Sequence, residues 1–302
     1  MKRLIVITGP TGIGKTDVSL FLAKKLKTEI ISADSRQIYK EMTIGTAVPA
    51  KEELAEIKHH FIQNKSIFEY YNASMFEMEV IELLKSLHEK YDNIIMAGGS
   101  GMYIDAVCKG IDDLPTSDPQ LRQKLIEQWK TQGIESLRFD LKKLDPEYYK
   151  IVDLKNPKRM LKGLEVCLMT GRTYTSFRKN TVKKRAFEIL TIGLELEREE
   201  IYNRINQRVD VMMDTGLYDE AKALYKHKER NALNTVGYKE IFAHFDGEYD
   251  LEKAVELIKR DSRRYAKRQL AWFKKNRATK WFSPFEKESI FKYVNSMIKE
   301  NT

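Results

Sequence analysis

The chain has 302 residues, of which 42% are hydrophobic and 32% charged, as is typical of a globular protein with one large or two ordinary domains. No apolar run approaches the roughly 20 residues that a membrane-spanning helix requires, so we expect a cytoplasmic protein with no membrane partner. Fifty-three Lys and Arg against 44 Asp and Glu leave a net charge of +9, and the two cysteines lack the spacing of a metal site.

The first predicted element is a buried strand over residues 4–8, which a glycine-rich loop follows directly. The loop has the spacing G-x-x-x-x-G-K-[ST], and it reads Gly9-Pro10-Thr11-Gly12-Ile13-Gly14-Lys15-Thr16. A helical pattern over residues 15–26 opens behind it. A phosphate-binding loop requires a strand before it and a helix after it, and both are predicted here. A glycine-rich turn that matched the motif by chance would have no reason to lie between them. The sequence therefore predicts a site for a di- or triphosphate.

Each part of this loop has a physical role. The three glycines let backbone N–H groups curl around phosphate oxygens, and the helix N-terminus adds the positive end of its dipole. Lys15 is expected to reach the terminal phosphates as a positive charge. The Thr16 hydroxyl is expected to bind Mg²⁺.

Further strand and helix units follow within the first hundred residues. Short apolar strands are predicted over residues 29–32 and 93–97, and an amphipathic helix over 72–90 lies between them. Apolar strands that alternate with helices predict an α/β fold, with a P-loop NTPase-like parallel sheet flanked by helices. Ligands of such folds bind beyond the carboxyl ends of the strands, where the phosphate loop, Asp34-Ser35 and Gly98–Gly101 all fall.

The sequence changes character at about residue 114. Charged, helical sequence continues to about residue 186, and a buried-strand pattern returns over residues 187–194. We therefore expect an all-helical insertion, 114–186, within a catalytic core formed by 1–113 and 187–302.

The last part of the chain is predicted to be mostly helical, with a basic helix over residues 251–275. Residues 259–280 hold ten basic side chains and one acid, Asp261, and a second basic cluster runs from Arg178 to Arg185. Basic segments of this density attract polyanions, so we favour a nucleic-acid partner over a solvated helix face. The apolar positions expected to pack inward are Ala254, Leu257, Ile258, Tyr265, Leu270 and Phe273.

Asp34 follows the predicted strand 29–32 directly, so it should lie near Thr16 at the strand ends. A carboxylate there could bind a metal or accept a proton from an incoming nucleophile. Because Asp-Ser is also common at helix starts, the residues alone leave a capping role equally open.

Several further motifs appear in order along nearly the whole chain. They include Asp34-Ser35-Arg36-Gln37-Ile38-Tyr39, Met42–Ala47, Gly98–Tyr103, Arg204–Val209, Thr235–Glu240 and Arg263–Phe273. Together they resemble the tRNA dimethylallyltransferases, also called tRNA isopentenyltransferases or isopentenylpyrophosphate transferases. No Cys/His finger follows the basic helix, which resembles the bacterial type of this family.

The resemblance implies transfer of a dimethylallyl group from dimethylallyl diphosphate to N6 of adenosine 37, next to the anticodon of tRNAs that read codons starting with U. The products would be N6-isopentenyladenosine and diphosphate. The phosphate loop would hold the diphosphate, while Lys15, Mg²⁺ and Arg208 neutralise its charge as the C–O bond breaks. Asp34 would accept a proton from the adenine amine, and Ser100 would belong to the same catalytic set.

The resemblance also implies which residues contact the tRNA of a monomeric enzyme. The adenine would be extruded into a channel lined by Asp34, Ser35, Arg36, Gln37 and Ser100. The insertion would bind phosphates and unstacked bases of the anticodon stem-loop through Arg122, Lys158, Arg159 and Lys162. Ser100 stands where the family usually has Thr and keeps the hydroxyl. Lys162 replaces an Arg, which keeps the charge but loses planar bidentate recognition.

Three other functions are weighed against this one. An isopentenyltransferase for free adenine nucleotides would not need both basic clusters, since a mononucleotide offers few phosphates. A P-loop kinase for a small metabolite accounts for residues 1–110 but leaves the basic C-terminal helix unused. A catalytically silent RNA-binding protein would not need intact Lys15, Thr16 and Asp34.

Overall fold

The computed structural model describes residues 1–115, 117–179 and 181–300, which form two compact units. The core unit comprises Met1–Cys108 and Lys184–Thr302, and the insertion unit comprises Lys109–Lys183. The insertion unit overlaps the segment expected over residues 114–186. No helix of the described part of the chain has both the length and the apolar character needed to cross a membrane.

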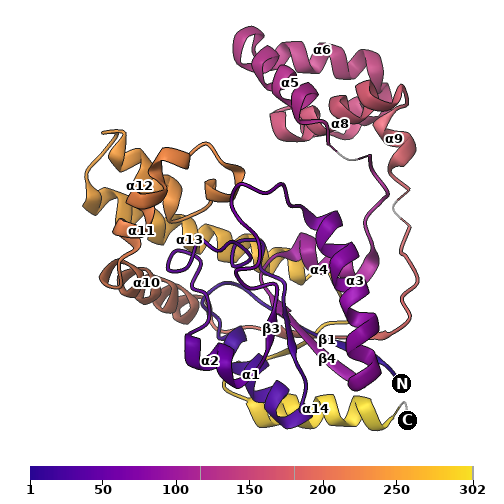
Figure 1. Cartoon of the computed structure of the whole chain (residues 1–302), viewed down its shortest axis with the longest axis vertical. Helices are drawn as coiled ribbons and strands as arrows, with labels where there is room; N and C mark the ends of the chain where they lie inside the picture. The colour runs from indigo at the N-terminus through magenta and orange to yellow at the C-terminus, as the bar shows by residue number, and fades with distance from the viewer. Residues whose placement is uncertain (116, 180, 301–302) are drawn as a thin grey trace. The chain divides into compact units, whose positions relative to one another are not determined.

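The core unit is built on a parallel sheet with the strand order β3-β2-β4-β1-β5-β6. Strands β1, β3 and β4 are labelled in Figure 1. At its centre, β1 (Arg3–Thr8) pairs in parallel with β4 (Asn93–Gly98) on one side and β5 (Glu188–Leu194) on the other. Every residue of β1 is buried, as expected for a strand that is covered on both faces. The α/β fold predicted from the sequence is confirmed.

Two short edge strands are not anticipated by the sequence pattern. Strand β3 (His59–His60) pairs with β2 (Ile30–Ser32), and β6 (Lys280–Phe282) pairs with β5. Strands of two and three residues are too short to show an alternation of apolar and polar side chains. The Trp281 ring of β6 packs directly on Gly193 of β5, where a Cβ would come 2.5 Å from the ring. The position of β6 therefore depends on packing against β5.

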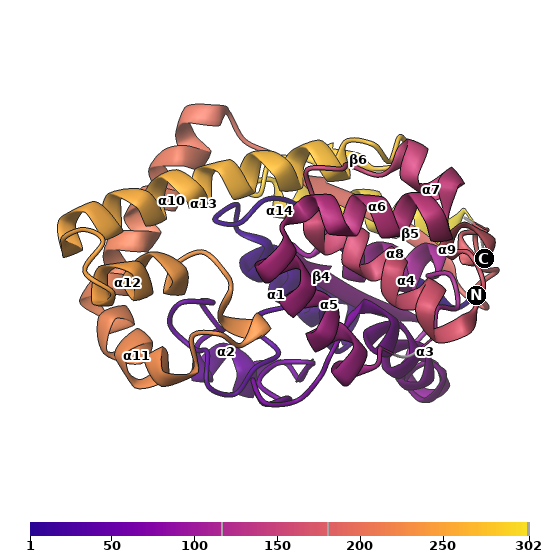
Figure 2. The ribbon, with the colours of Figure 1, turned by 90° about the horizontal axis from the view of Figure 1, so that it is seen from above.

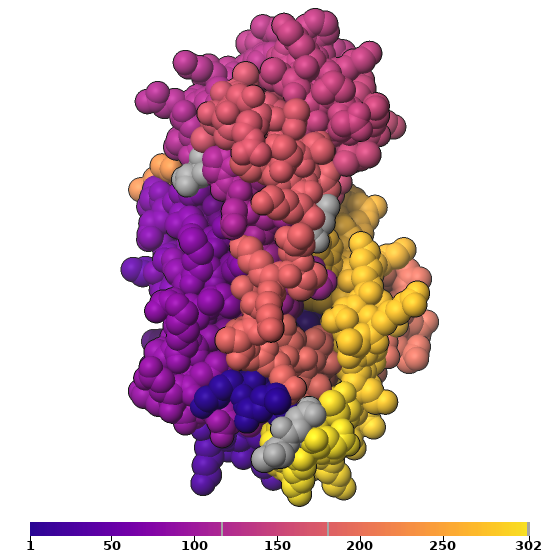
Figure 3. Space-filling view, turned by 90° about the vertical axis from the view of Figure 1, so that its right-hand side faces the viewer, coloured from indigo at the N-terminus to yellow at the C-terminus, as the bar shows by residue number. Residues whose placement is uncertain are grey.

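Helices cover this sheet and extend beyond it. They are α1 (Lys15–Leu26), α2 (Lys51–Glu56), α3 (Ala73–Lys90), α4 (Gly101–Lys109), α10 (Arg198–Asp214), α11 (Leu217–Leu224), α12 (Tyr238–Phe245), α13 (Leu251–Phe273) and α14 (Lys287–Lys299). Side chains of α1, α10 and α14 pack in one core cluster with Ile5 and Ile7 of β1. Helix α13 runs beside α10 (Figure 2), and α14 ends beside the first residues of the chain (Figure 3).

The buried stripe of α13 differs from the expected one, because Leu257 and Leu270 are only half-buried and Tyr265 is exposed. The side chains that this helix buries are Ala254, Ile258, Ala266, Gln269 and Phe273. Their spacing of three to four residues follows one helical face, and Tyr265 lies about 100° away from Ala266 around the axis. The prediction that Tyr265 packs inward is wrong, because its side chain is 37% exposed and lines a cavity.

The insertion unit is helical throughout its regular elements. It contains α5 (Pro119–Gln132), α6 (Ile134–Leu144), α7 (Pro146–Ile151), α8 (Pro157–Thr170) and α9 (Tyr174–Phe177). Proline opens three of these helices behind Asp118, Asp145 and Asn156, whose side chains cap them. A separate hydrophobic core joins α5, α6 and α8 through Leu125, Leu141 and Leu164.

Candidate active site

The phosphate loop adopts a backbone that only glycine tolerates. Gly9, Gly12 and Gly14 have φ angles of 152°, 78° and 100°, a region that residues with a Cβ rarely adopt. Helix α10 supports the loop, because Arg204 Nε donates a 2.9 Å hydrogen bond to the carbonyl oxygen of Gly12. A Cβ on Gly12 would also come 3.1 Å from the side chain of Ile205.

Lys15 folds back over this loop. Its Nζ donates hydrogen bonds to the carbonyl oxygens of Gly9, at 3.0 Å, and Pro10, at 2.7 Å. Burial lowers the pKa of Lys15 to about 7, the negative charge of Asp34 opposes this shift, and the positive charge of Arg208 adds to it. An anion bound at the loop would favour the protonated amine.

Asp34 serves as a turn cap, one of the two roles left open by the sequence. Its Oδ1 accepts hydrogen bonds from the backbone N–H of Arg36, at 2.9 Å, and of Gln37, at 3.3 Å. The same carboxylate acts electrostatically on Lys15 and Arg208, since its charge partly opposes the lowering of both pKa values by burial. The cap occupies one carboxylate oxygen, so Asp34 can cap the turn and still face the cations of the site.

Ser35 and Ser100 are brought together by a close approach of two loops. Ser100 Oγ accepts a 2.9 Å hydrogen bond from Ser35 N–H and donates a 3.0 Å bond to Ser35 Oγ. A Cβ on Gly98 would meet the Ala33 carbonyl oxygen at 2.2 Å, so only glycine permits this approach. Ser35 lines the cavity, whereas Ser100 is buried and is not among the lining residues. Ser100 thus reaches the site through Ser35.

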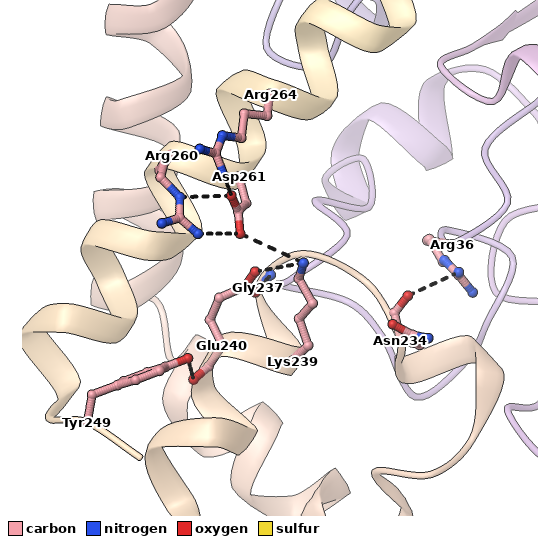
Figure 4. Close-up of polar contacts among 9 residues, drawn as sticks. All are labelled: Arg36, Asn234, Gly237, Lys239, Glu240, Tyr249, Arg260, Asp261 and Arg264. Carbon is pink, nitrogen blue, oxygen red and sulfur yellow. Dashed lines mark hydrogen bonds and ion pairs between the residues drawn. The ribbon is translucent and has the colours of Figure 1, made fainter. Parts of the chain in front are cut away.

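Gln37 and Arg36 hold neighbouring backbone in place. Gln37 Nε2 donates to the carbonyl oxygens of Thr46, at 3.2 Å, and Ala47, at 2.8 Å. The Arg36 guanidinium donates to the carbonyl oxygens of Asn231, at 3.1 Å, and Asn234, at 3.5 Å, and Figure 4 shows the second contact. Both side chains line the cavity beside the phosphate loop.

Gln269 is a site residue that the sequence analysis missed. Its Oε1 accepts a 2.9 Å hydrogen bond from Thr11 N–H, and its Nε2 donates a 2.8 Å bond to the Gly99 carbonyl oxygen. The side chain is buried and so fastens α13 to the phosphate loop and to the loop after β4. The signal for it is a polar amide within the otherwise small or apolar buried stripe of α13.

These elements enclose a cavity of about 860 Å³ within the core unit. Its cationic and polar lining includes Lys15, Thr16, Asp34, Arg208 and Arg268. Apolar side chains line it as well, among them Ala47, Val48, Pro49, Ile62, Val209 and Met212. Burial lowers the pKa of Arg208, and the charge of Asp34 opposes that shift. The cavity can therefore hold a polyanion that is joined to a small apolar group.

Asp261, the lone acid of the basic segment, gathers cations near the cavity. Arg260 contacts its carboxylate at 3.0 and 3.1 Å, Arg264 at 3.3 Å and Lys239 at 3.8 Å. Lys239 also lies 3.2 Å from Glu240 Oε1, and Figure 4 shows it between the two carboxylates. Lys239 lines the cavity, so this cluster adds positive charge to the cavity edge.

The four basic residues singled out in the insertion unit fall into two groups. Arg122 Nη1 lies 2.9 Å from the buried carboxylate of Glu165, and Lys162 Nζ lies 4.0 Å from it. Lys158 and Arg159 are exposed on the first turn of α8. The second pair is exposed, whereas the side chains of Arg122 and Lys162 are 32% and 31% exposed and lie against Glu165.

No group of three His, Cys, Asp or Glu side chains among the described residues could hold a metal ion. Thr16 is the metal ligand that the sequence predicts, and its side chain lines the cavity next to Lys15. Mg²⁺ is usually bound by one or two protein ligands together with substrate phosphates and water, rather than by protein ligands alone. A single hydroxyl fits that kind of coordination.

Comparisons with known proteins agree with this geometry. A family model described as IPP transferase matches residues 37–276. The tRNA dimethylallyltransferase 1 of Bacteroides fragilis is 51% identical over 99% of both chains, and the tRNA dimethylallyltransferase of Christiangramia forsetii is 52% identical over 98% of both.

Solved structures are similar over most of this chain as well. The tRNA isopentenylpyrophosphate transferase of Bacillus halodurans has a TM-score of 0.73 and 34% identity, covering 99% of this chain and 98% of that one. A eukaryotic dimethylallyltransferase acting on tRNA has a TM-score of 0.73 and 28% identity, covering 90% of this chain and 70% of that one. The chain therefore belongs to the IPP transferase family, the family of the tRNA dimethylallyltransferases.

Proposed function

We propose that this protein transfers the dimethylallyl group of dimethylallyl diphosphate to N6 of adenosine 37 in tRNAs that read codons starting with U. The products are N6-isopentenyladenosine in the tRNA and free diphosphate. The observation that carries the proposal is one cavity, lined by phosphate-loop residues, Asp34, Arg208 and apolar side chains, in a member of this family. A relative 51% identical to the chain is named tRNA dimethylallyltransferase, and a similar solved structure is described as acting on tRNA.

The donor diphosphate is assigned to the loop Gly9–Thr16. Backbone N–H groups and the start of α1 supply partial positive charge, and Lys15 supplies a full one. Lys15 now donates to two carbonyl oxygens of the loop, and phosphate oxygens would replace these as stronger, charge-assisted acceptors. The five-carbon chain would lie against the apolar part of the lining.

The reaction forms a carbon–nitrogen bond, breaks a carbon–oxygen bond and moves one proton from N6 to Asp34. The N6 lone pair attacks the first carbon of the dimethylallyl group, the carbon–oxygen bond breaks, and its electron pair leaves with the diphosphate. Lys15 and Arg208 neutralise the charge that grows on the leaving oxygen. Asp34 accepts the proton released from N6 and, as a carboxylate, orients the amine beforehand.

We assign Mg²⁺ to the Thr16 hydroxyl, where diphosphate oxygens would complete the coordination. When bound, the ion supplies further positive charge to the leaving group. Thr16 lines the cavity next to Lys15, where the donor diphosphate is assigned, which supports this position for the ion.

The tRNA is assigned to the basic surfaces, and adenosine 37 to the cavity as an extruded base. The residues assigned to contact this base line the cavity; they are Asp34, Ser35, Arg36 and Gln37. Ser100 is assigned an indirect role through its hydrogen bond with Ser35. In the insertion unit, exposed Lys158 and Arg159 are suited to phosphate contacts. Arg122 and Lys162, which lie against Glu165 but remain partly exposed, are assigned to the same anticodon stem-loop. The enzyme is proposed to act as a monomer.

A transfer assay tests this function. Purified protein, Mg²⁺ and dimethylallyl diphosphate are mixed with unmodified tRNA, with AMP and with ATP, and the nucleosides are analysed by mass. We expect a dimethylallyl increment on adenosine 37 of the tRNA alone. Modification of AMP or ATP would assign the protein to free nucleotides, and phosphoryl transfer from ATP without prenyl transfer would make it a kinase. Lys15→Met is the inactive control.

A further inference from the structure

The carboxylate of Glu220 on α11 binds three consecutive backbone N–H groups of a distant loop. Its Oε2 accepts from Thr43 N–H at 2.9 Å and from Ile44 N–H at 2.8 Å, and its Oε1 accepts from Gly45 N–H at 2.9 Å. Hydrogen bonds to an ionised carboxylate are stronger than those between neutral groups. The loop is therefore fixed at three successive residues by one side chain.

Tyr238, at the start of α12, completes this arrangement. Its hydroxyl donates a 2.6 Å hydrogen bond to Glu220 Oε1, and its ring is fully buried. A Cβ on Gly45 would lie 2.6 Å from the ring, so only glycine lets the loop close onto Tyr238. Burial and the charge of Glu220 raise the pKa of Tyr238, which keeps the hydroxyl a donor at physiological pH.

The fixed loop forms one side of the cavity, and we call residues 43–49 the cavity wall. Its residues Gly45, Thr46, Ala47, Val48 and Pro49 line the cavity, whereas neither Glu220 nor Tyr238 does. Gln37 donates to the carbonyl oxygens of Thr46 and Ala47. Ala47 is held at φ 48°, which is costly for a residue with a side chain and needs support from its surroundings.

We infer that Glu220 is a positioning residue for the transfer reaction, which fixes the cavity wall from behind through the backbone N–H groups of residues 43–45. This inference rests on the proposed function. A displacement of reacting groups by about 1 Å can cost about a hundredfold in rate, so a loosened wall lowers kcat. Most of the tRNA contacts are assigned to basic surfaces away from the wall, so we expect the tRNA Kd to change little.

The test compares Glu220→Ala, Glu220→Gln and Tyr238→Phe with a matched control, Glu229→Gln, which removes an exposed carboxylate from the loop between α11 and α12. Amide hydrogen exchange of Thr43, Ile44 and Gly45, the tRNA Kd, kcat and the melting temperature are measured for each. In Glu220→Ala we expect exchange at these three amides to rise at least tenfold and kcat to fall at least tenfold. The tRNA Kd should change less than twofold. Glu220→Gln and Tyr238→Phe should show smaller effects, and the control none.

Two results overturn the inference. If kcat of Glu220→Ala stays within twofold of wild type while the three amides exchange faster, the wall position does not govern the reaction. If exchange rises equally in the central strands and the loss of activity matches the unfolded fraction, Glu220 contributes to global stability alone. An inactive wild type would instead refute the proposed function, and the exchange data would then decide whether Glu220 fixes the wall.

Discussion

The side-chain amide of Gln269 donates a 2.8 Å hydrogen bond to the carbonyl oxygen of Gly99, 170 residues earlier in the chain. A Cβ on Gly99 would come 2.4 Å from the donating nitrogen, so the contact is built for glycine. The oxygen of the same side-chain amide accepts from Thr11 N–H, so the basic helix α13 supports the glycine-rich loop as well as presenting a charged surface.

Replacement of Gln269 by Leu is expected to weaken both the fold and donor binding. The substitution leaves a backbone N–H and a backbone carbonyl without their partner, at about 1–3 kcal/mol for each buried group. Urea unfolding measures the loss, and the KM for dimethylallyl diphosphate should rise. The exposed Gln120→Leu serves as the control and should change neither quantity. An unchanged KM in Gln269→Leu would show that the Thr11 contact does not shape the loop.

Asp34→Asn separates the two roles of this side chain. An amide oxygen can still accept from Arg36 and Gln37, so the turn cap and the melting temperature should be preserved. The proton acceptor is lost, and we expect the transfer rate to fall by about 10²–10⁴-fold. Single-turnover kinetics with saturating tRNA measure this change. Near wild-type turnover would mean that Asp34 is a cap and that another group accepts the proton.

The lowered pKa of Lys15 predicts a specific dependence of stability on pH. With a folded pKa of about 7 and an ordinary value of 10.5, the unfolded chain binds more protons than the folded one between these limits. The contribution of Lys15 to the free energy of unfolding therefore rises as the pH increases from about 7 to about 10, and it is flat below that range. Urea unfolding of wild type and Lys15→Met across this range, without ligand, measures the difference. A constant difference would contradict the burial of this amine.

The basic residues of the insertion unit should separate by experiment into structural and binding groups. Arg122→Met leaves the fully buried carboxylate of Glu165 without its guanidinium partner. We expect a loss of about 1–3 kcal/mol, less than for a fully buried pair because Arg122 is partly exposed. Thermal unfolding measures it.

Arg159→Gln should leave the melting temperature unchanged, since the side chain is exposed. A lost phosphate contact should weaken tRNA binding and reduce the slope of log K against log salt by about 1. Filter binding at several salt concentrations gives this slope. If Arg159→Gln kept the wild-type slope, the first turn of α8 would not contact the tRNA backbone.

The sequence is most informative where the signal is local. The strand over residues 4–8 and the helix over 15–26 correspond to β1 (Arg3–Thr8) and α1 (Lys15–Leu26), because an apolar run and helical spacing are written in consecutive residues. Strands β3 and β6 escape this reasoning, since each forms by pairing with a longer neighbour rather than by its own pattern.

Contacts between distant residues also escape it. Glu220 and Thr43 are 177 positions apart, and no spacing within either segment indicates that they meet. Tyr265 is the opposite case, because its aromatic character predicts burial, whereas the residue is exposed and lines the cavity. A family motif can mark such residues as important, but it does not say which other residues they contact.

The place of β1 in the sheet has a consequence for the order in which the protein is made. Its second neighbour, β5, is synthesised only after the whole insertion unit, and the core cluster that contains Ile5 also requires Ile290 and Val294 of α14. A nascent chain that ends before residue 188 thus has a phosphate-loop strand with one open edge, a site for unwanted pairing. Among the described residues, the core cluster of the insertion unit is formed by side chains within Lys109–Lys183. On the ribosome, its helices can pack while the sheet of the core unit still waits for its last strands.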